Sequence, residues 1–235
     1  MDDASLAEVR RVFEQWAVYD AIIQNDYMEH PQLIAQLQEQ FPAGAGPLRI
    51  IDLGCGDSWL ASRGFALADV AHYRGIDLST EAITRARRNL STWEDRVELI
   101  AGDLLQVTQT LPAGSADVVL MSYSLHHFGP EQKRTVLSQA THLLAPGGRL
   151  VLIDQIRGED ESREAYLERL ATEIEVNWTA LTPDQLQISL DHIKASDYPE
   201  TASWLAETIQ SLQLQPVATL LPENPFYSGA VYRQP

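Results

Sequence analysis

The stretch Ile50-Ile51-Asp52-Leu53-Gly54-Cys55-Gly56-Asp57-Ser58 decides how the rest of the chain is interpreted. An apolar run ends there at two glycines, Gly54 and Gly56, with one residue between them, and a helical pattern follows at once. This order predicts a buried strand, a tight turn and a helix N-terminus, which is where α/β folds bind nucleotides. The glycines allow a sharp turn and let a ligand approach the backbone without an intervening Cβ. We therefore predict a cofactor site at this loop.

The residues around the loop exclude two common classes of nucleotide site. The dinucleotide fingerprint G-x-G-x-x-G/A requires a small residue where this chain has Trp59. No lysine follows in the Walker position, so the phosphate-binding P-loop is excluded as well. The carboxylate of Asp52, at the end of the predicted strand, suits a ligand with a cationic amine better than a pyrophosphate.

Five stretches, in order and correctly spaced, resemble the motifs of class I S-adenosylmethionine-dependent methyltransferases. The first three are Asp52-Leu53-Gly54-Cys55-Gly56, Gly75-Ile76-Asp77-Leu78-Ser79 and Ala101-Gly102-Asp103-Leu104. The later two are Ala116-Asp117-Val118-Val119-Leu120 and Leu144-Ala145-Pro146-Gly147-Gly148-Arg149-Leu150. The resemblance covers about residues 48–154, and it departs from the family at Ser58, where a third glycine is often found.

The resemblance implies an α/β, Rossmann-like fold. We expect a seven-stranded, mostly parallel sheet with helices on both faces and an antiparallel last strand beside the fifth. We also expect an N-terminal helical cap over residues 1–46, a methyltransferase domain over 47–235 and a helical lid inserted at 159–198. Leading helices are predicted over residues 5–28 and 31–40, and later ones over 59–67 and 200–214. A turn is predicted at 145–148, and strands at 48–53, 70–76, 97–101, 116–121, 149–153, 217–221 and 226–233.

The resemblance also assigns S-adenosyl-L-methionine as the cofactor, with S-adenosyl-L-homocysteine as its product. Asp77 lies 23 residues after Gly54 at a strand end, where an acid accepts hydrogen bonds from ribose hydroxyls. In the family, an acid at the position of Asp103 bonds the adenine amino group, and the next backbone N–H, of Leu104, meets a ring nitrogen. The expected cofactor contacts are Asp52, Gly54, Cys55, Gly56, Asp77, Leu78, Gly102, Asp103, Leu104, Ser122 and Tyr27.

Two adjacent histidines, His126 and His127, follow the fourth predicted strand at its carboxyl end, facing the ligand crevice of α/β sheets. A histidine can take a proton from an oxygen or nitrogen nucleophile near neutral pH, so both are predicted as catalytic residues. Contact with substrate or cofactor, or a structural role, stays open for each. Adjacent side chains on a loop seldom point the same way, so we expect at most one to reach the substrate.

Residues near the predicted lid and the strand ends are candidates for binding the acceptor. Tyr19 has an alternative interpretation as a core residue, and Asp154 and His192 have alternative interpretations as cap or surface residues. Cys55 is expected to be a small turn residue rather than a nucleophile, because no group to activate it is evident. The predicted substrate-binding residues are Tyr19, Tyr123, Asp154, His192 and Tyr227.

Composition limits the partners. The net charge is −16, from 17 basic and 33 acidic residues, which argues against nucleic acid and favours a neutral or cationic small molecule. We expect no membrane partner and a cytoplasmic location, since no apolar run is long enough to cross a bilayer and Met1-Asp2-Asp3 lacks a signal-peptide pattern. No metal site is expected, because Cys55 is the only cysteine and the histidines are scattered. A monomer and a homodimer are both compatible with the sequence.

The sequence therefore predicts transfer of a methyl group to an oxygen, nitrogen or sulfur atom of a small molecule. Two alternatives stay open. An aminopropyltransferase shares the fold, but it usually has paired acids after the fourth strand, where this chain has Ser122-Tyr123-Ser124. A catalytically silent partner subunit would keep the cofactor motifs without the chemistry.

Overall fold

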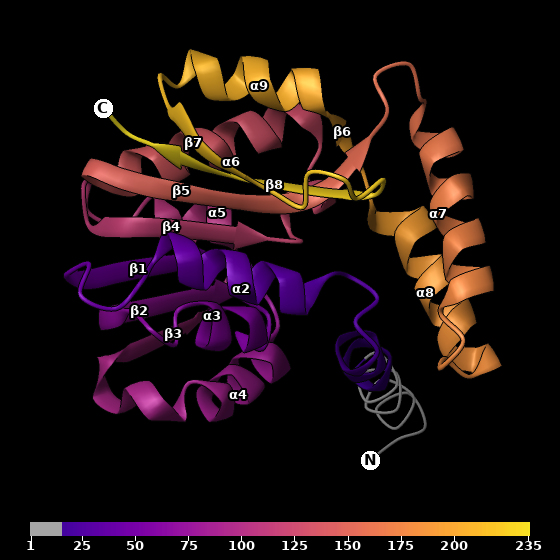
Figure 1. The fold of residues 1–235 in the computed structure, drawn as a ribbon, viewed down its shortest axis with the longest axis horizontal. Coiled ribbons are helices and arrows are strands. Elements are labelled where there is room, and N and C mark those ends of the chain that lie inside the picture. Colours follow the sequence, from indigo (N-terminus) through magenta and orange to yellow (C-terminus); the bar gives the residue numbers. More distant parts are fainter. Residues whose placement is uncertain (1–15) are drawn as a thin grey trace.

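The computed structural model of the protein describes residues 16–235 (Figure 1). Residues 16–24 are helical. The earlier part of the helix predicted over residues 5–28 lies outside the described residues, as does the corresponding part of the predicted cap over 1–46. Within residues 16–235, no helix is both long enough and apolar enough to cross a membrane.

A central sheet with the strand order β3-β2-β1-β4-β5-β8-β7 organises the molecule (Figure 1). Neighbours from β3 to β5 pair in parallel, whereas β8 is antiparallel to both β5 and β7. The predicted sheet and its antiparallel last strand are thereby confirmed, and a short β6 pairs with β5 off the main path. The strands are β1 (Pro47–Leu53), β2 (Asp69–Asp77), β3 (Val97–Ala101), β4 (Ala116–Ser122), β5 (Leu144–Arg157), β6 (Glu200–Thr201), β7 (Gln215–Leu220) and β8 (Tyr227–Arg233).

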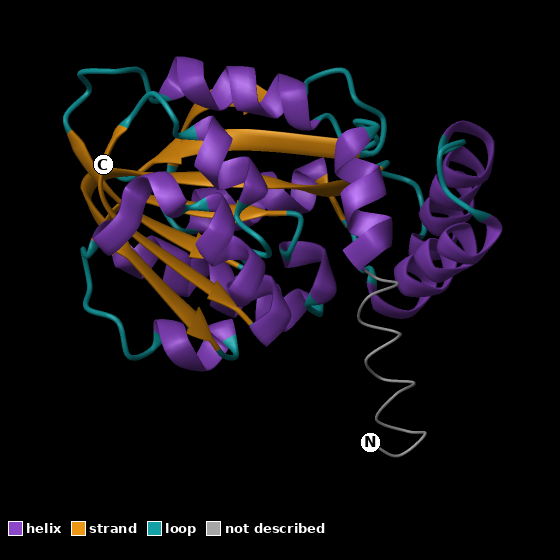
Figure 2. Ribbon diagram, turned by 90° about the horizontal axis from the view of Figure 1, so that it is seen from below, coloured by secondary structure: helices purple, strands orange, loops and turns teal. Residues whose placement is uncertain are grey.

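Helices cover both faces of this sheet (Figure 2). One hydrophobic cluster joins the sheet to α2, α3 and α4, and a second joins its other face to α5, α6 and α9. The helices are α2 (His30–Gln40), α3 (Trp59–Gly64), α4 (Thr80–Asn89), α5 (Leu104–Thr108), α6 (Pro130–Leu143), α7 (Arg163–Asn177), α8 (Pro183–Ser196) and α9 (Ala202–Ser211), with 3-10 turns η1 (Ser91–Arg96) and η2 (Leu125–His127).

The central strand β4 is apolar along its middle, from Val118 to Met121, because both of its faces are covered. Val118 and Leu120 belong to the first cluster, whereas Val119 and Met121 belong to the second. Successive side chains of a strand point to opposite faces, so a strand covered on both sides has no polar position along its middle.

The helices α7 and α8 lie side by side beyond the carboxyl ends of the parallel strands (Figures 1 and 2). They form a third hydrophobic cluster of their own, which includes Leu170, Ile174 and Ile193. Tyr27 and Phe226 pack against this cluster, so the pair is attached to the rest of the protein from two distant segments. We call residues 163–196 the helical pair below.

The structure corrects three local predictions. The predicted helix over 59–67 ends at Gly64, where an added Cβ would lie 2.6 Å from Leu37 Cδ1, so α2 and α3 approach closely there. The turn predicted at 145–148 falls inside β5, because Leu144 already pairs with Ala116, although Gly147 keeps a positive φ of 76°. The helix predicted from residue 200 begins at 202, because the two preceding residues pair with β5 as β6.

Candidate active site

The loop between β1 and α3 has the backbone conformation that its glycines predict. Gly54 has φ 72° and Gly56 has φ 52°. A Cβ on Gly54 would lie 2.6 Å from Ser124 Cβ, so both the conformation and the space require glycine. Ser124 Oγ also donates to the Leu53 carbonyl oxygen at 2.9 Å. The loop after β4 is therefore held directly against the first glycine loop.

Asp52 is a buried carboxyl at the end of β1, 2% exposed. Its Oδ2 accepts a hydrogen bond of 2.6 Å from the Tyr73 hydroxyl, while its Oδ1 has no hydrogen-bond partner among the described residues. Burial raises the pKa of Asp52 to about 7, with a further rise from the charge of Asp77 and an opposing effect of the Tyr73 hydrogen bond. An unpaired buried carboxyl oxygen of this kind fits a cationic amine.

Asp77 links the first two sequence motifs. Its Oδ2 accepts from the backbone N–H of Gly56 at 2.9 Å, and its Oδ1 accepts from Ser79 N–H at 2.8 Å. Leu78, between them in the second motif, is 78% exposed. The carboxylate therefore lies at the end of β2 beside the glycine loop, where the resemblance expects the ribose.

The third motif lies at the end of β3, and Cys55 lies in the glycine loop. Asp103 follows β3 and Gly102, and its Oδ1 accepts from Leu105 N–H at 2.8 Å as the cap of α5, whose first residue is Leu104. Cys55 is buried, and burial above all raises the pKa of its thiol, with Asp52 adding to the rise. The thiol is therefore protonated and unreactive at neutral pH.

Asp57 and Tyr73, which are not among the predicted site residues, also contact this site. Asp57 Oδ1 accepts a 3.1 Å hydrogen bond from the Tyr19 hydroxyl, and its Oδ2 accepts from Asn89 Nδ2 at 3.1 Å. The helical residues 16–24 are thus held over the glycine loop. Because Asp57 directly follows Gly56, the sequence alone could have identified it as a residue of the glycine loop. Nothing in the sequence around Tyr73 indicates its bond to Asp52.

The remaining predicted tyrosines separate into two places. Tyr27 stacks on Trp178 with ring centroids 5.0 Å apart, and its hydroxyl accepts from Ala180 N–H at 2.8 Å, at the turn of the helical pair. Tyr123, which follows Ser122 at the end of β4, packs edge-to-face against Tyr227 with centroids 5.5 Å apart. Its backbone adopts a positive φ of 51°. Strained conformations of non-glycine residues are concentrated at functional loops.

His126 is buried, 5% exposed, and is held by Asp154. Its Nδ1 bonds Asp154 Oδ1, and its backbone N–H donates to Asp154 Oδ2 at 3.0 Å. Burial alone lowers the pKa of His126, but Asp154 and then Asp197 more than offset this, so the pKa lies above its ordinary value. The pKa of His127 is lowered to about 4, first by burial and then by the neighbouring charge of His126.

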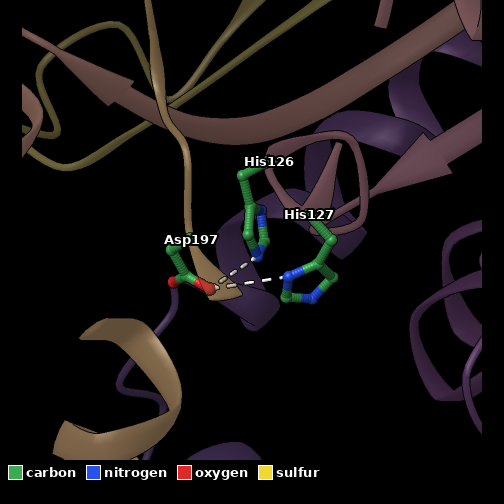
Figure 3. Close-up of side chains that lie close together, drawn as sticks. All are labelled: His126, His127 and Asp197. Atoms are coloured by element: carbon green, nitrogen blue, oxygen red, sulfur yellow. Dashed lines mark ion pairs between the residues drawn. The ribbon is translucent and has the colours of Figure 1, made fainter. Parts of the chain in front are cut away.

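The segment after α8 brings further groups to these histidines. Asp197 Oδ1 lies 3.6 Å from His126 Nε2 and 3.5 Å from His127 Nδ1 (Figure 3). His192, on α8, has its Nε2 3.9 Å from the same oxygen. The structure therefore unites three of the predicted residues, His126, His127 and His192, around one carboxylate. Tyr19 instead bonds the glycine loop.

Comparison with known proteins agrees with this architecture. The model of a family described as "Methyltransferase domain" matches residues 50–148. The carboxy-S-adenosyl-L-methionine synthase of Chromohalobacter salexigens is 33% identical over 139 residues, 57% of this chain and 48% of the relative. The synthase of the same name from Aeromonas salmonicida is 27% identical over 191 residues, 78% of this chain and 76% of the relative. The chain spans about half the length of the Chromohalobacter relative and of a Shewanella relative.

Solved structures share the fold. The PH0226 protein of Pyrococcus horikoshii OT3 superposes with a TM-score of 0.65 at 19% identity, covering 90% of this chain and 92% of that one. The 1,6-didemethyltoxoflavin-N1-methyltransferase of Burkholderia thailandensis, solved with S-adenosylhomocysteine, superposes with a TM-score of 0.61 at 17% identity, covering 100% and 91%.

The residues present fit S-adenosyl-L-methionine, the cofactor of these methyltransferases. The unpaired Oδ1 of Asp52 suits the cationic amine, Gly54 and Gly56 leave the backbone open, and Asp77 lies at the expected ribose position. The motifs in order, the parallel sheet with its antiparallel last strand and the methyltransferase-domain match over residues 50–148 together support the resemblance to class I S-adenosylmethionine-dependent methyltransferases.

Proposed function

We propose that the protein transfers a methyl group from S-adenosyl-L-methionine to an oxygen, nitrogen or sulfur atom of a small molecule. The observation that carries the proposal is the convergence of three elements at the carboxyl edge of the sheet. The glycine loop, Asp77 and the loop after β4 are joined there by the contact of Gly54 with Ser124 and by the bond from Gly56 to Asp77. The net charge of −16 favours a neutral or cationic acceptor.

Holding and orienting the reactants is the main task of the protein in this proposal. When bound, the cofactor supplies an already electrophilic methyl group, so alignment of the acceptor provides much of the rate. Asp52 and Asp77 hold the cofactor, and Tyr19, Tyr123 and Tyr227 are proposed to contact the acceptor or the loops around it. The helical pair, residues 163–196, is proposed as the lid that excludes water.

His126 and His127 remain the proposed catalytic groups for an acceptor that must lose a proton. His127 is the more accessible candidate, since its side chain is 39% exposed and its lowered pKa leaves the ring neutral at pH 7, although the same lowering makes it a weaker base. Both carboxylate oxygens of Asp154 bond His126, one to its backbone N–H and one to its ring. Asp154 is therefore proposed to position His126 rather than to bind a cationic acceptor.

A second function is favoured by one specific observation. The relatives described above are named carboxy-S-adenosyl-L-methionine synthases, so an activity that modifies the cofactor itself is the alternative. That name belongs to those proteins, and the match to the first of them covers only part of its length, 48%.

Mass spectrometry of the reaction distinguishes the two. The protein is incubated with cofactor carrying an isotopically labelled methyl group and with a panel of small phenols, amines and thiols. Methyl transfer predicts S-adenosylhomocysteine together with a labelled acceptor, whereas the alternative predicts a carboxylated cofactor when small carboxylic acids are supplied. If the protein binds the cofactor normally but forms neither product above the level of Asp77→Ala, it is a catalytically silent subunit and the proposal is wrong.

A further inference from the structure

A buried carboxylate lies at the junction between η2 and the segment that follows α8. Asp197 is 1% exposed, and its Oδ2 accepts a 2.5 Å hydrogen bond from Gln155 Nε2. Its Oδ1 has no hydrogen-bond partner among the described residues. Burying an unpaired carboxylate oxygen is unfavourable, so a group that satisfies it is expected.

Three imidazole nitrogens face this oxygen. His126 Nε2, His127 Nδ1 and His192 Nε2 lie 3.6, 3.5 and 3.9 Å from it. These separations are too long for direct hydrogen bonds. Ligand atoms about 2.0–2.1 Å from a tetrahedral zinc ion lie about 3.3 Å from one another, so the observed separations are close to those of ligands that share one cation.

We propose that three imidazoles and one carboxylate form a binding site for a divalent transition-metal cation of the zinc class: His126, His127, His192 and Asp197. Ligand atoms of the first two histidines and the carboxylate all lie within 4.8 Å of one another (Figure 3). Nitrogen-rich sets of this kind suit zinc or its neighbours, whereas magnesium and calcium prefer oxygen ligands.

The surroundings of the ligands support this assignment. The Nδ1 of His126 bonds Asp154, which is the carboxylate–histidine arrangement that orients metal-binding imidazoles. Gln155 holds the other oxygen of Asp197 in the same way. The nearby Lys133 is paired with Glu200 at 2.8 Å. The negative charges of the buried Asp154 and Asp197 therefore remain to balance the charge of a metal ion.

Binding requires two small adjustments. His127 Nδ1 also lies 3.2 Å from the Ser196 carbonyl oxygen, and this contact must be released. The side chain of His192 is 53% exposed and is therefore free to close the last few tenths of an ångström.

A cation at this point would fasten the end of α8 to the turn after β4. His126 and His127 come from η2, His192 comes from α8, and Asp197 directly follows α8. The bound ion would occupy the ring nitrogens that a general base needs. In the metal-loaded protein these histidines would hold the helical pair rather than move a proton, and this inference does not depend on methyl transfer.

Cobalt titration tests the site directly. Metal-stripped protein should bind one equivalent of Co²⁺ with the visible absorption bands of a tetrahedral complex, and Zn²⁺ should displace it. His192→Ala and Asp197→Asn should each weaken binding by roughly tenfold or more. His142→Ala, which removes an exposed histidine of α6, is the matched control and should bind like the wild type.

A second readout keeps the test valid if Asp197→Asn folds poorly. Zinc should raise the Tm of the wild type and slow hydrogen exchange in residues 183–201, and both effects should be lost in His192→Ala, whose side chain is largely at the surface. Equal cobalt affinity in the wild type and His192→Ala, or a spectrum of octahedral cobalt alone, would mean that the ion binds the acidic surface, and the proposal would be wrong.

Discussion

At the scale of single residues, Asp52 shows how burial sets the charge of a carboxyl that is proposed to bind the cofactor. The free protein holds this carboxyl protonated below its pKa of about 7, because burial raises that pKa. A cationic amine binds the ionised form, so binding at lower pH must first remove the proton. The cofactor end of the site is therefore expected to respond to pH near neutrality.

We predict that the affinity for S-adenosylhomocysteine falls about tenfold for each pH unit below 7 and levels off above it. Calorimetry between about pH 5.5 and 7.5 measures this. Asp52→Asn, which removes the titrating group but keeps its shape, should show a flat profile with weaker binding. A wild-type profile as flat as that of the variant would mean that the amine lies elsewhere.

Asp77 is predicted to contribute through both the ligand and the loop. Asp77→Ala should weaken S-adenosylhomocysteine binding by about 2 kcal/mol, because a charge-assisted contact is lost. It also leaves the N–H groups of Gly56 and Ser79 without their acceptor. Calorimetry on folded wild type and variant measures the change, with Glu98→Ala at the next strand as a control that should bind normally. Unchanged affinity in Asp77→Ala would place the ribose elsewhere.

At the scale of elements, the contact between the glycine loop and the loop after β4 is where we expect a small substitution to reduce stability most. Gly54→Ala should lower the free energy of unfolding by about 3 kcal/mol, since it combines a left-handed backbone with a Cβ clash at Ser124. Gly44 has a similar φ of 81° with open space around it, so Gly44→Ala should cost only about 1 kcal/mol. Urea unfolding measures both, and equal losses would remove the clash from the explanation.

The helical pair depends on Tyr27 for its attachment to the N-terminal segment. Tyr27→Ala removes the stack on Trp178 and the acceptor of Ala180 N–H, and should lower the opening free energy of residues 178–196 by about 2 kcal/mol. Hydrogen exchange followed by mass spectrometry measures this. Tyr27→Phe keeps the stack and should show about half the effect. If hydrogen exchange in α6 became faster to the same extent, the variant would be destabilised globally rather than at the helical pair.

At the scale of the whole molecule, the charge of −16 opposes folding by self-repulsion. Raising sodium chloride from about 20 to 200 mM shortens the Debye length severalfold, so the Tm should rise by a few degrees. Differential scanning calorimetry measures the shift, and potassium chloride should give the same result. A fall in Tm over this range would show that the surface ion pairs outweigh the repulsion.

The sequence by itself determined the fold, and it placed the residues proposed to bind the cofactor at the carboxyl ends of their strands, because both depend on local patterns. The two glycines, the acid 23 residues after Gly54 and the apolar runs each specify a turn, a strand end or a buried strand. Parallel strands then bring Asp52, Asp77 and Asp103 to one edge of the sheet, whatever the details of packing. The antiparallel last strand beside the fifth follows from the family resemblance.

Only the tertiary structure decided which side chains meet at the other end. His126 and Asp197 are about 70 positions apart, and their approach depends on how the helical pair packs, which no local spacing encodes. The bonds from Tyr73 to Asp52 and from Tyr19 to Asp57 likewise join segments whose patterns indicate only core residues or a helix face. Local periodicity specifies which face of an element is buried, but the partner of a buried polar group is set by the three-dimensional packing.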